Sequence, residues 1–219
     1  MRVVATADAP RVHTPAIVNT LPITFVLSCR RLVAVLGLAA ACLAPLAHAQ
    51  TPLAKPERAP DVPYQPTNDE VVVGMLNLAR VGARDIVYDL GCGDGRIVIA
   101  AVKERGARGV CVEIDPKLVA LARANARKAG VEDRIKFLTQ DLFKTDFREA
   151  TVVMLFLWPE VNLKLRPQLQ RELAPGSRVV SHMHTMGDWP PEKTVQIKAT
   201  DRERVIYLWT IGQPAGGTK

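Results

Sequence analysis

The sequence predicts a doubly wound α/β fold with a mostly parallel sheet, and three features lead to that prediction. From residue 67 onward, short apolar runs alternate with amphipathic segments, which is the pattern of strands and helices that follow one another. The first of these runs ends in a glycine cluster, as a buried strand does before a tight turn. The last two runs complete the pattern as an antiparallel hairpin.

The predicted helices have recognisable first and last residues. Thr67 to Glu70 match a capping box, in which the Thr67 hydroxyl caps the first turn and Glu70 reaches back, so we expect a helix that continues to about Arg80. Another helix follows Asp115 and a proline at the first helical position, and it ends at Gly130. The remaining helices are predicted at 96–105 and 159–173, and the strands at 85–90, 108–114, 134–139, 151–157, 177–182, 194–199 and 205–211.

Length and composition indicate one globular domain with a tail. Of the 219 residues, 48% are hydrophobic and 23% are charged, which excludes a disordered or fibrous chain. Four cysteines are too few for a disulfide scaffold. Four arginines and one aspartate precede residue 50, so residues 50–219 carry only +4 of the net charge of +7. That charge is too small and too evenly spread to indicate a nucleic-acid partner.

The N-terminal region resembles a targeting leader. Arg30 and Arg31 precede an uncharged run at 32–47, and a small-x-small site ends at Ala49, as in a secretory signal peptide. We therefore expect residues 1–49 to direct export to the periplasm. A membrane anchor through residues 32–47 and a mitochondrial transit peptide are the alternatives.

The rest of the chain divides into three further parts. Residues 50–66 contain five prolines, which indicates an extended, solvated linker. We expect the catalytic or binding domain at 67–211 and a flexible tail at 212–219.

The glycine-rich turn after the first predicted strand is the most informative segment. Gly91, Gly93 and Gly95 allow a sharp turn and a close approach to a ligand at the carboxyl end of that strand. Their spacing is G-x-G-x-G, one residue shorter than the dinucleotide-binding G-x-G-x-x-G. The carboxylates of Asp89 and Asp94 would repel a diphosphate, but they suit a ligand that carries an ammonium and a sulfonium group.

Two more acids follow the next two strands. Glu113 ends the second strand, where a carboxylate can accept hydrogen bonds from both hydroxyls of a ribose. Asp141 follows the third strand, where a carboxylate can accept one from the exocyclic amine of adenine. Either acid alone is typical of an exposed loop. With Asp89, they place acids at the ends of three successive strands, which predicts a nucleoside site.

These segments resemble a known family. DLGCGDGR, GVCVEIDP and QDLF resemble motifs I, post-I and II of the class I S-adenosylmethionine-dependent methyltransferases. Within that superfamily, PYQPT at 63–67, LVALARANA at 118–126 and RVVSHMHTMGDW at 178–189 are most similar to the ATP synthase c-subunit lysine N-methyltransferases and their bacterial relatives. The resemblance implies a seven-stranded Rossmann-like methyltransferase sheet and S-adenosylmethionine as cofactor.

The resemblance also implies which residues bind the cofactor, and no metal site is predicted. Tyr64 and Thr67 are candidates because the PYQPT segment would lie over the cofactor. The full set of predicted cofactor-binding residues is Tyr64, Thr67, Asp89, Gly91, Gly93, Asp94, Gly95, Glu113, Asp141 and Leu142. Residues 184–193 are too few for the helix usual at that place, so we expect one face of the sheet there to be open.

The catalytic residues are not evident from the sequence. His182 and His184 are weak candidates near the end of the fifth strand, and Trp158 either lines an acceptor channel or packs in the interior. The segment from Leu157 to Glu160 replaces the Asn/Asp-Pro-Pro-Tyr of enzymes that methylate nucleobase amines, which argues against that reaction.

Cys92 and Cys111 are the cysteines that fall outside the predicted leader. Both lie in adjacent strand regions and are interpreted as small buried packing residues.

Together these features predict a methyltransferase that acts on a protein lysine. The alternatives are a small-molecule or RNA methyltransferase on the same fold, and an exported domain that binds a nucleoside without catalysis. The acceptor is thus expected to be a protein or a small molecule.

Overall fold

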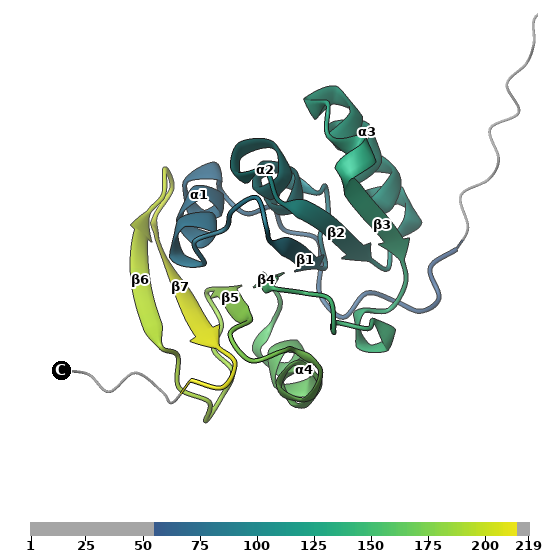
Figure 1. The fold of residues 1–219 in the computed structure, drawn as a ribbon. Helices are drawn as coiled ribbons and strands as arrows, with labels where there is room; N and C mark the ends of the chain where they lie inside the picture. The colour runs from purple at the N-terminus through teal and green to yellow at the C-terminus, as the bar shows by residue number, and fades with distance from the viewer. Residues whose placement is uncertain (1–54, 214–219) are drawn as a thin grey trace, which may run out of the picture. The chain divides into compact units, whose positions relative to one another are not determined.

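One sheet of seven strands organises residues 55–213, the part of the chain that the computed structural model describes (Figure 1). The strand order is β3-β2-β1-β4-β5-β7-β6. The first five strands of this order are parallel, and β7 and β6 close the sheet as an antiparallel hairpin. The strands are β1 (Ile86–Leu90), β2 (Arg108–Glu113), β3 (Ile135–Thr139), β4 (Val152–Leu155), β5 (Arg178–His182), β6 (Lys193–Lys198) and β7 (Glu203–Thr210).

Helices cover both faces of this sheet, as a doubly wound fold requires. Figure 1 shows α1, α2 and α3 on one face and α4 on the other. The helices are α1 (Asp69–Leu78), α2 (Arg96–Arg105), α3 (Pro116–Ala129) and α4 (Pro159–Glu172), with 3₁₀ turns η1 (Glu132–Arg134) and η2 (Leu142–Lys144). The predicted fold class is confirmed. The fourth strand is shorter than expected, since it ends at Leu155, and this leaves Phe156 and Leu157 in a loop.

The predicted capping box at the start of α1 is wrong. The N-cap residue is Asn68, and no side chain caps the first turn. The Glu70 carboxylate instead accepts a hydrogen bond from the Thr200 hydroxyl. Thr67 is buried, and its carbonyl accepts a hydrogen bond from Arg96 Nη1 at 2.8 Å. Contacts with distant residues therefore occupy Thr67 and Glu70, the two residues that the capping box would have paired with each other.

The face of the sheet beside the loop after β5 is covered, contrary to expectation. The loop contains no helix, but Met186 is fully buried and Trp189 packs against Trp209 with ring centroids 5.8 Å apart. The Trp209 indole N–H also donates a hydrogen bond to the Trp189 carbonyl at 2.9 Å. Large side chains from the loop thus cover the sheet where a helix would otherwise pack.

The expected leader at 1–49 and most of the expected tail at 212–219 lie outside the described residues. Within 55–213, no helix is both long and apolar enough to cross a membrane. Residues 55–66 of the predicted linker form neither helix nor strand, as expected.

Candidate active site

The turn between β1 and α2 needs glycine at two positions. Gly91 and Gly93 have φ angles of 74° and 54°, a region that side chains other than glycine rarely adopt. A Cβ atom on Gly93 would lie 2.5 Å from Cε2 of Tyr64, so the Tyr64 ring packs directly on the turn. The N–H groups of Gly91 and Cys92 both donate to the Val112 carbonyl, at 2.8 and 3.1 Å. The turn is thereby held against the end of β2.

Gly95 has a different role. It also has a positive φ, of 80°, but it is the N-cap residue of α2 and is not among the residues that line the cavity described below. A Cβ atom at this position would lie 3.0 Å from Cβ of Ala122 on α3. Gly95 therefore allows α2 and α3 to pack closely, and among the predicted cofactor residues it is the one that does not line the cavity.

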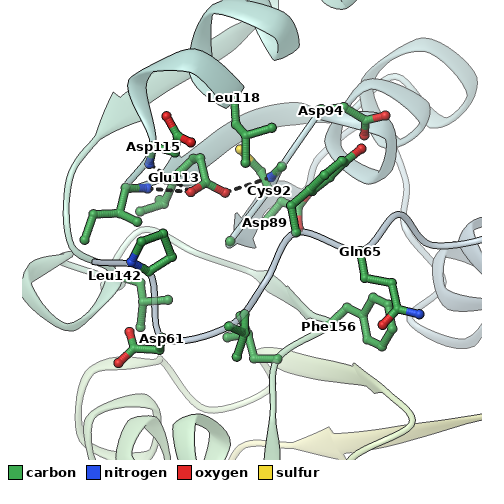
Figure 2. Close-up of a pocket in the computed structure, with 18 of the residues that line it drawn as sticks. Asp61, Gln65, Asp89, Cys92, Asp94, Glu113, Asp115, Leu118, Leu142 and Phe156 are labelled. Atoms are coloured by element: carbon green, nitrogen blue, oxygen red, sulfur yellow. Dashed lines mark hydrogen bonds between the residues drawn. The ribbon is translucent and has the colours of Figure 1, made fainter. Parts of the chain in front are cut away.

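A cavity of about 370 Å³ lies at the carboxyl ends of the central strands (Figure 2). Its lining carries more negative than positive charge. The carboxylates are those of Asp61, Asp89, Asp94, Glu113, Asp115 and Asp141, and the cations are Arg58 and Arg96. Figure 2 shows Glu113 and Asp115 on one side of the cavity and Gln65 and Phe156 on the opposite side. Such a lining favours a cationic ligand over a polyanion.

The Glu113 carboxylate is held by three backbone N–H groups. Oε2 accepts a hydrogen bond from Gly93 at 3.0 Å, and Oε1 accepts from Ile114 and Asp115 at 2.8 and 3.0 Å. These bonds fix the direction in which the carboxylate faces the cavity. The carboxylate retains acceptor capacity for a further donor.

Asp89 is the most deeply buried acid of the cavity. Its side chain is 2% exposed, and no group within 55–213 donates a hydrogen bond to Oδ2. Burial raises the pKa of Asp89 to about 8, and the nearby charges of Asp94 and Glu113 act in the same direction. A cation beside this carboxyl would therefore relieve an electrostatic cost.

Arg58 holds the expected linker against the cavity. Its guanidinium donates to both oxygens of Asp141, from Nε at 2.7 Å and from Nη2 at 3.0 Å, and this pairing holds the pKa of Asp141 below its usual range. The Phe143 N–H donates to the same carboxylate at 3.0 Å. Residues 58 and 60–67 all line the cavity. The segment 63–67 was expected to cover the site, whereas residues 58 and 60–62 were expected to be a solvated spacer and are instead part of its wall. The sequence gives no periodic signal for this stretch, because it is rich in proline.

Four other predicted cofactor residues also face the cavity. Tyr64, Thr67 and Leu142 line it, and Asp94 does so while its carboxylate pairs with Arg96 at 2.7 Å. The structure therefore brings every predicted cofactor residue except Gly95 to one place.

The predicted catalytic candidates do not line the cavity. Trp158 is 50% exposed at the start of α4, and His184 lies in the loop after β5. His182 is buried, and burial together with the nearby charge of Arg204 lowers its pKa to about 4. Gln65 and Phe156 are among the residues that face the cavity from this side. Neither was singled out, because Phe156 was predicted to lie inside a strand and Gln65 inside the linker.

Cys92 and Cys111 form a disulfide, with Cα atoms 5.4 Å apart. Their interpretation as free packing residues is therefore wrong, although both are buried. The bond joins the glycine-rich turn to β2, the strand that ends at Glu113. Sequence spacing did not reveal it, because a separation of 19 residues does not specify a distance in space.

The fold and the cavity define a class of protein. A doubly wound sheet with a glycine-rich turn after β1 and acids at the carboxyl ends of three successive strands is the arrangement of the class I S-adenosylmethionine-dependent methyltransferases. Residues 89–193 match the family model described as the ANTKMT methyltransferase domain.

Two relatives match nearly their whole length. A protein-lysine N-methyltransferase of Saccharolobus islandicus is 44% identical over 155 residues, which is 70% of this chain and 96% of the relative. A crystal structure titled as an RNA methyltransferase from Salinibacter ruber, in complex with S-adenosyl-L-homocysteine, is 52% identical, with a TM-score of 0.65 over 68% of this chain and 95% of that one.

A third relative matches over part of its length. The adenine nucleotide translocase lysine N-methyltransferase of Mus musculus is 38% identical over 141 residues, which is 64% of this chain and 61% of that protein. The chain belongs to the methyltransferase family of the Saccharolobus islandicus enzyme, and its cofactor is S-adenosylmethionine.

The disulfide should contribute to stability. We expect the double variant Cys92→Ser/Cys111→Ser to lose about 2–4 kcal/mol of unfolding free energy, because the cross-link restricts the unfolded chain. Urea denaturation followed by circular dichroism measures the difference. A reductant should cause the same loss in the wild type and none in the double variant. Equal midpoints for the double variant and the oxidised wild type would contradict this expectation.

Proposed function

We propose that the protein transfers a methyl group from S-adenosylmethionine to the ε-amino group of a lysine in another protein. The observation that carries the proposal is that one cavity contains acids at the carboxyl ends of three neighbouring strands, β1, β2 and β3, and is apolar beyond the end of β4. The acids suit a cationic cofactor and a lysine acceptor, which approaches as an ammonium ion. The similarity to the Saccharolobus islandicus protein-lysine N-methyltransferase supports this acceptor.

The cavity residues fit the cofactor chemically. We assign Asp141 to the adenine amine and Glu113 to the ribose hydroxyls, because these carboxylates follow β3 and β2 and retain acceptor capacity. Asp89 is assigned to the cationic part of the cofactor, since its Oδ2 is buried without a partner in the described structure. The order Asp141, Glu113, Asp89 follows the strand order β3-β2-β1, so the reacting end would lie toward β4.

Positioning and desolvation are the contributions of this chain to the reaction. When bound, S-adenosylmethionine supplies a methyl group on a positively charged sulfur. The wall at 60–67 and the side chains of Leu157 and Val161 keep water from the reacting atoms. A lysine amine has a reference pKa of about 10.4 and must be neutral to react. The apolar side chains after β4 favour the neutral amine, because desolvation disfavours its charged form.

An RNA acceptor is the second candidate, because the Salinibacter ruber structure carries that title. The lining of the cavity speaks against it, since its carboxylates would repel a phosphate backbone. Leu157 occupies the place where nucleobase-methylating enzymes carry an asparagine or aspartate, and it is buried against the turn at Gly91.

Labelled S-adenosylmethionine tests the acceptor. Purified full-length protein is incubated with poly-L-lysine, total bacterial protein or total RNA, and we expect label in the first two only, recoverable as methyl-lysine. Label in RNA alone, or in no macromolecule, would contradict the proposal.

Glu113→Gln tests the cofactor site in a binding measurement. We expect cofactor affinity to fall about 10- to 100-fold, because a hydrogen bond to a charged group contributes roughly 1.5–3 kcal/mol. Glu132→Gln is the matched control, since Glu132 pairs with Arg127 at the surface. Calorimetric titration measures both affinities, and equal affinities would contradict the assignment.

Cofactor binding should depend on pH through Asp89. In the free protein Asp89 keeps its proton up to its pKa of about 8, whereas a bound cation favours the carboxylate. Binding near neutral pH therefore releases a proton, so the affinity should rise between about pH 6 and 8 and level off above the raised pKa. Titrations in buffers of different ionisation enthalpy measure the released proton. Asp89→Asn should release none, and proton release that persists in this variant would contradict the assignment.

We also propose that the protein is exported. The leader-like sequence at 30–49 supports this, as does the Cys92–Cys111 disulfide, because disulfides persist chiefly in oxidising compartments. Fractionation of tagged cells, with alkylation of free thiols, should find a shortened chain in the periplasm whose Cys92 and Cys111 resist alkylation. A cytosolic product with an intact N-terminus would refute export. A full-length product in the membrane fraction would indicate an anchor through 32–47 instead.

A further inference from the structure

The end of the cavity after β4 is formed by an aromatic side chain. Phe156 is the first residue after β4, and it lines the cavity together with Gln65, Leu157 and Val161. In the sheet, β4 adjoins β1 on the side opposite to β2. If the cofactor binds at the ends of β3, β2 and β1, the Phe156 ring lies beyond it and faces the place where the methyl acceptor would bind.

A buried histidine supports this ring from the next strand. The Phe156 and His182 rings have centroids 4.0 Å apart, with their planes inclined by 36°. His182 is 1% exposed, and neither ring nitrogen has a hydrogen-bond partner within the described part of the chain. A buried polar ring without partners costs free energy that an apolar side chain of similar size would not. The contact with the Phe156 ring is thus apolar in character and leaves both ring nitrogens without a donor or acceptor in the described residues.

The backbone after His182 is fixed in an unusual conformation. Met183 has a φ of 67°, and the His184 N–H donates to the His182 carbonyl at 2.9 Å, which together form a tight turn. The fully buried Asn162 side chain donates to the His184 and Thr185 carbonyls at 3.4 Å and to the Ser181 hydroxyl at 3.2 Å. Backbone strain of this kind persists where the surroundings enforce it, and it is enriched near functional sites. The end of β5, and with it the His182 ring, is thus held in one place.

We propose that the Phe156 ring is the surface against which the acceptor lysine packs, and that His182 is a positioning residue that holds this ring in place. The inference rests on the proposed lysine acceptor. A fixed aromatic face attracts an ammonium ion and packs against the methylene groups of a lysine side chain. The low pKa of His182 keeps the supporting imidazole neutral, so it does not repel the incoming cation.

Steady-state kinetics of four variants tests the proposal. The acceptor probe is poly-L-lysine, or the labelled bacterial protein if the polymer is not methylated. We expect Phe156→Leu to raise the acceptor KM roughly tenfold while the Kd for S-adenosylmethionine stays within about twofold. His182→Ala should raise the same KM, and His182→Phe, which preserves a ring stack, should restore it. Phe137→Leu is the matched control, because Phe137 is buried on β3 and does not line the cavity, so its variant should leave the acceptor KM unchanged.

Three results would overturn the inference. An unchanged acceptor KM in Phe156→Leu would show that the ring does not contact the acceptor, and an equal rise in the cofactor Kd would assign the ring to the cofactor. A His182→Phe variant that folds but stays as impaired as His182→Ala would exclude support by ring stacking. Thermal unfolding of each variant identifies any that fails to fold, and Phe156→Tyr, which keeps the aromatic face, should then retain the wild-type KM. If the wild type binds cofactor but methylates no lysine, the proposed function fails first and this inference with it.

Discussion

The hydrogen bonds accepted by the Glu113 carboxylate hold together the elements on which the cofactor end of the cavity depends. They join the turn at Gly93 to the residues between β2 and α3. A glutamine at this position would place an amide NH₂ against one of these N–H donors, so it would weaken the turn as well as the proposed contact with the ribose. The Cys92–Cys111 bond ties the same turn to the same strand by a second, covalent connection.

The excess of acids in the cavity is tolerable because, within the described residues, five of the six are compensated by charged or backbone donors and Asp89 is the exception at one of its oxygens. Buried charges need such partners, since removing them from water is expensive. The compensated acids are Asp61 and Asp141 with Arg58, Asp94 with Arg96, Glu113 with three backbone N–H groups, and Asp115 with the Lys117 N–H. Asp89 lacks a donor for its Oδ2 within the described residues and keeps its proton instead. In the proposed complex, the positive charge of the cofactor would lie beside the Asp89 carboxyl and compensate its negative charge.

The sequence predicted the fold and the convergence of the acids at the ends of β1, β2 and β3. It did not predict the residues that line the cavity after β4. Hydrophobic periodicity and the predicted strand ends indicate where Asp89, Glu113 and Asp141 converge, because the carboxyl ends of parallel strands lie at one edge of the sheet. Phe156 was not predicted, because an apolar run does not reveal that β4 ends two residues early. The contact of Arg58 with Asp141 lies in a proline-rich segment without periodicity, and it spans 83 residues of sequence. Such contacts are set by tertiary packing, which local patterns do not encode.

The two ends of the cavity are built by different physical means, and this has a consequence for acceptor choice. At the cofactor end, the turn is held by several independent contacts: the Glu113 carboxylate, the hydrogen bonds from Gly91 and Cys92 to the Val112 carbonyl, and a disulfide. At the other end, a ring stack and a tight turn at Met183 hold Phe156, and both depend on the side chains of neighbouring residues. Under the proposed function, changes at Gln65, Phe156 or His182 would alter which acceptor packs there while cofactor binding is retained. The same fold could then serve different acceptors, because the loops after β4 and β5 would determine specificity without changing the sheet.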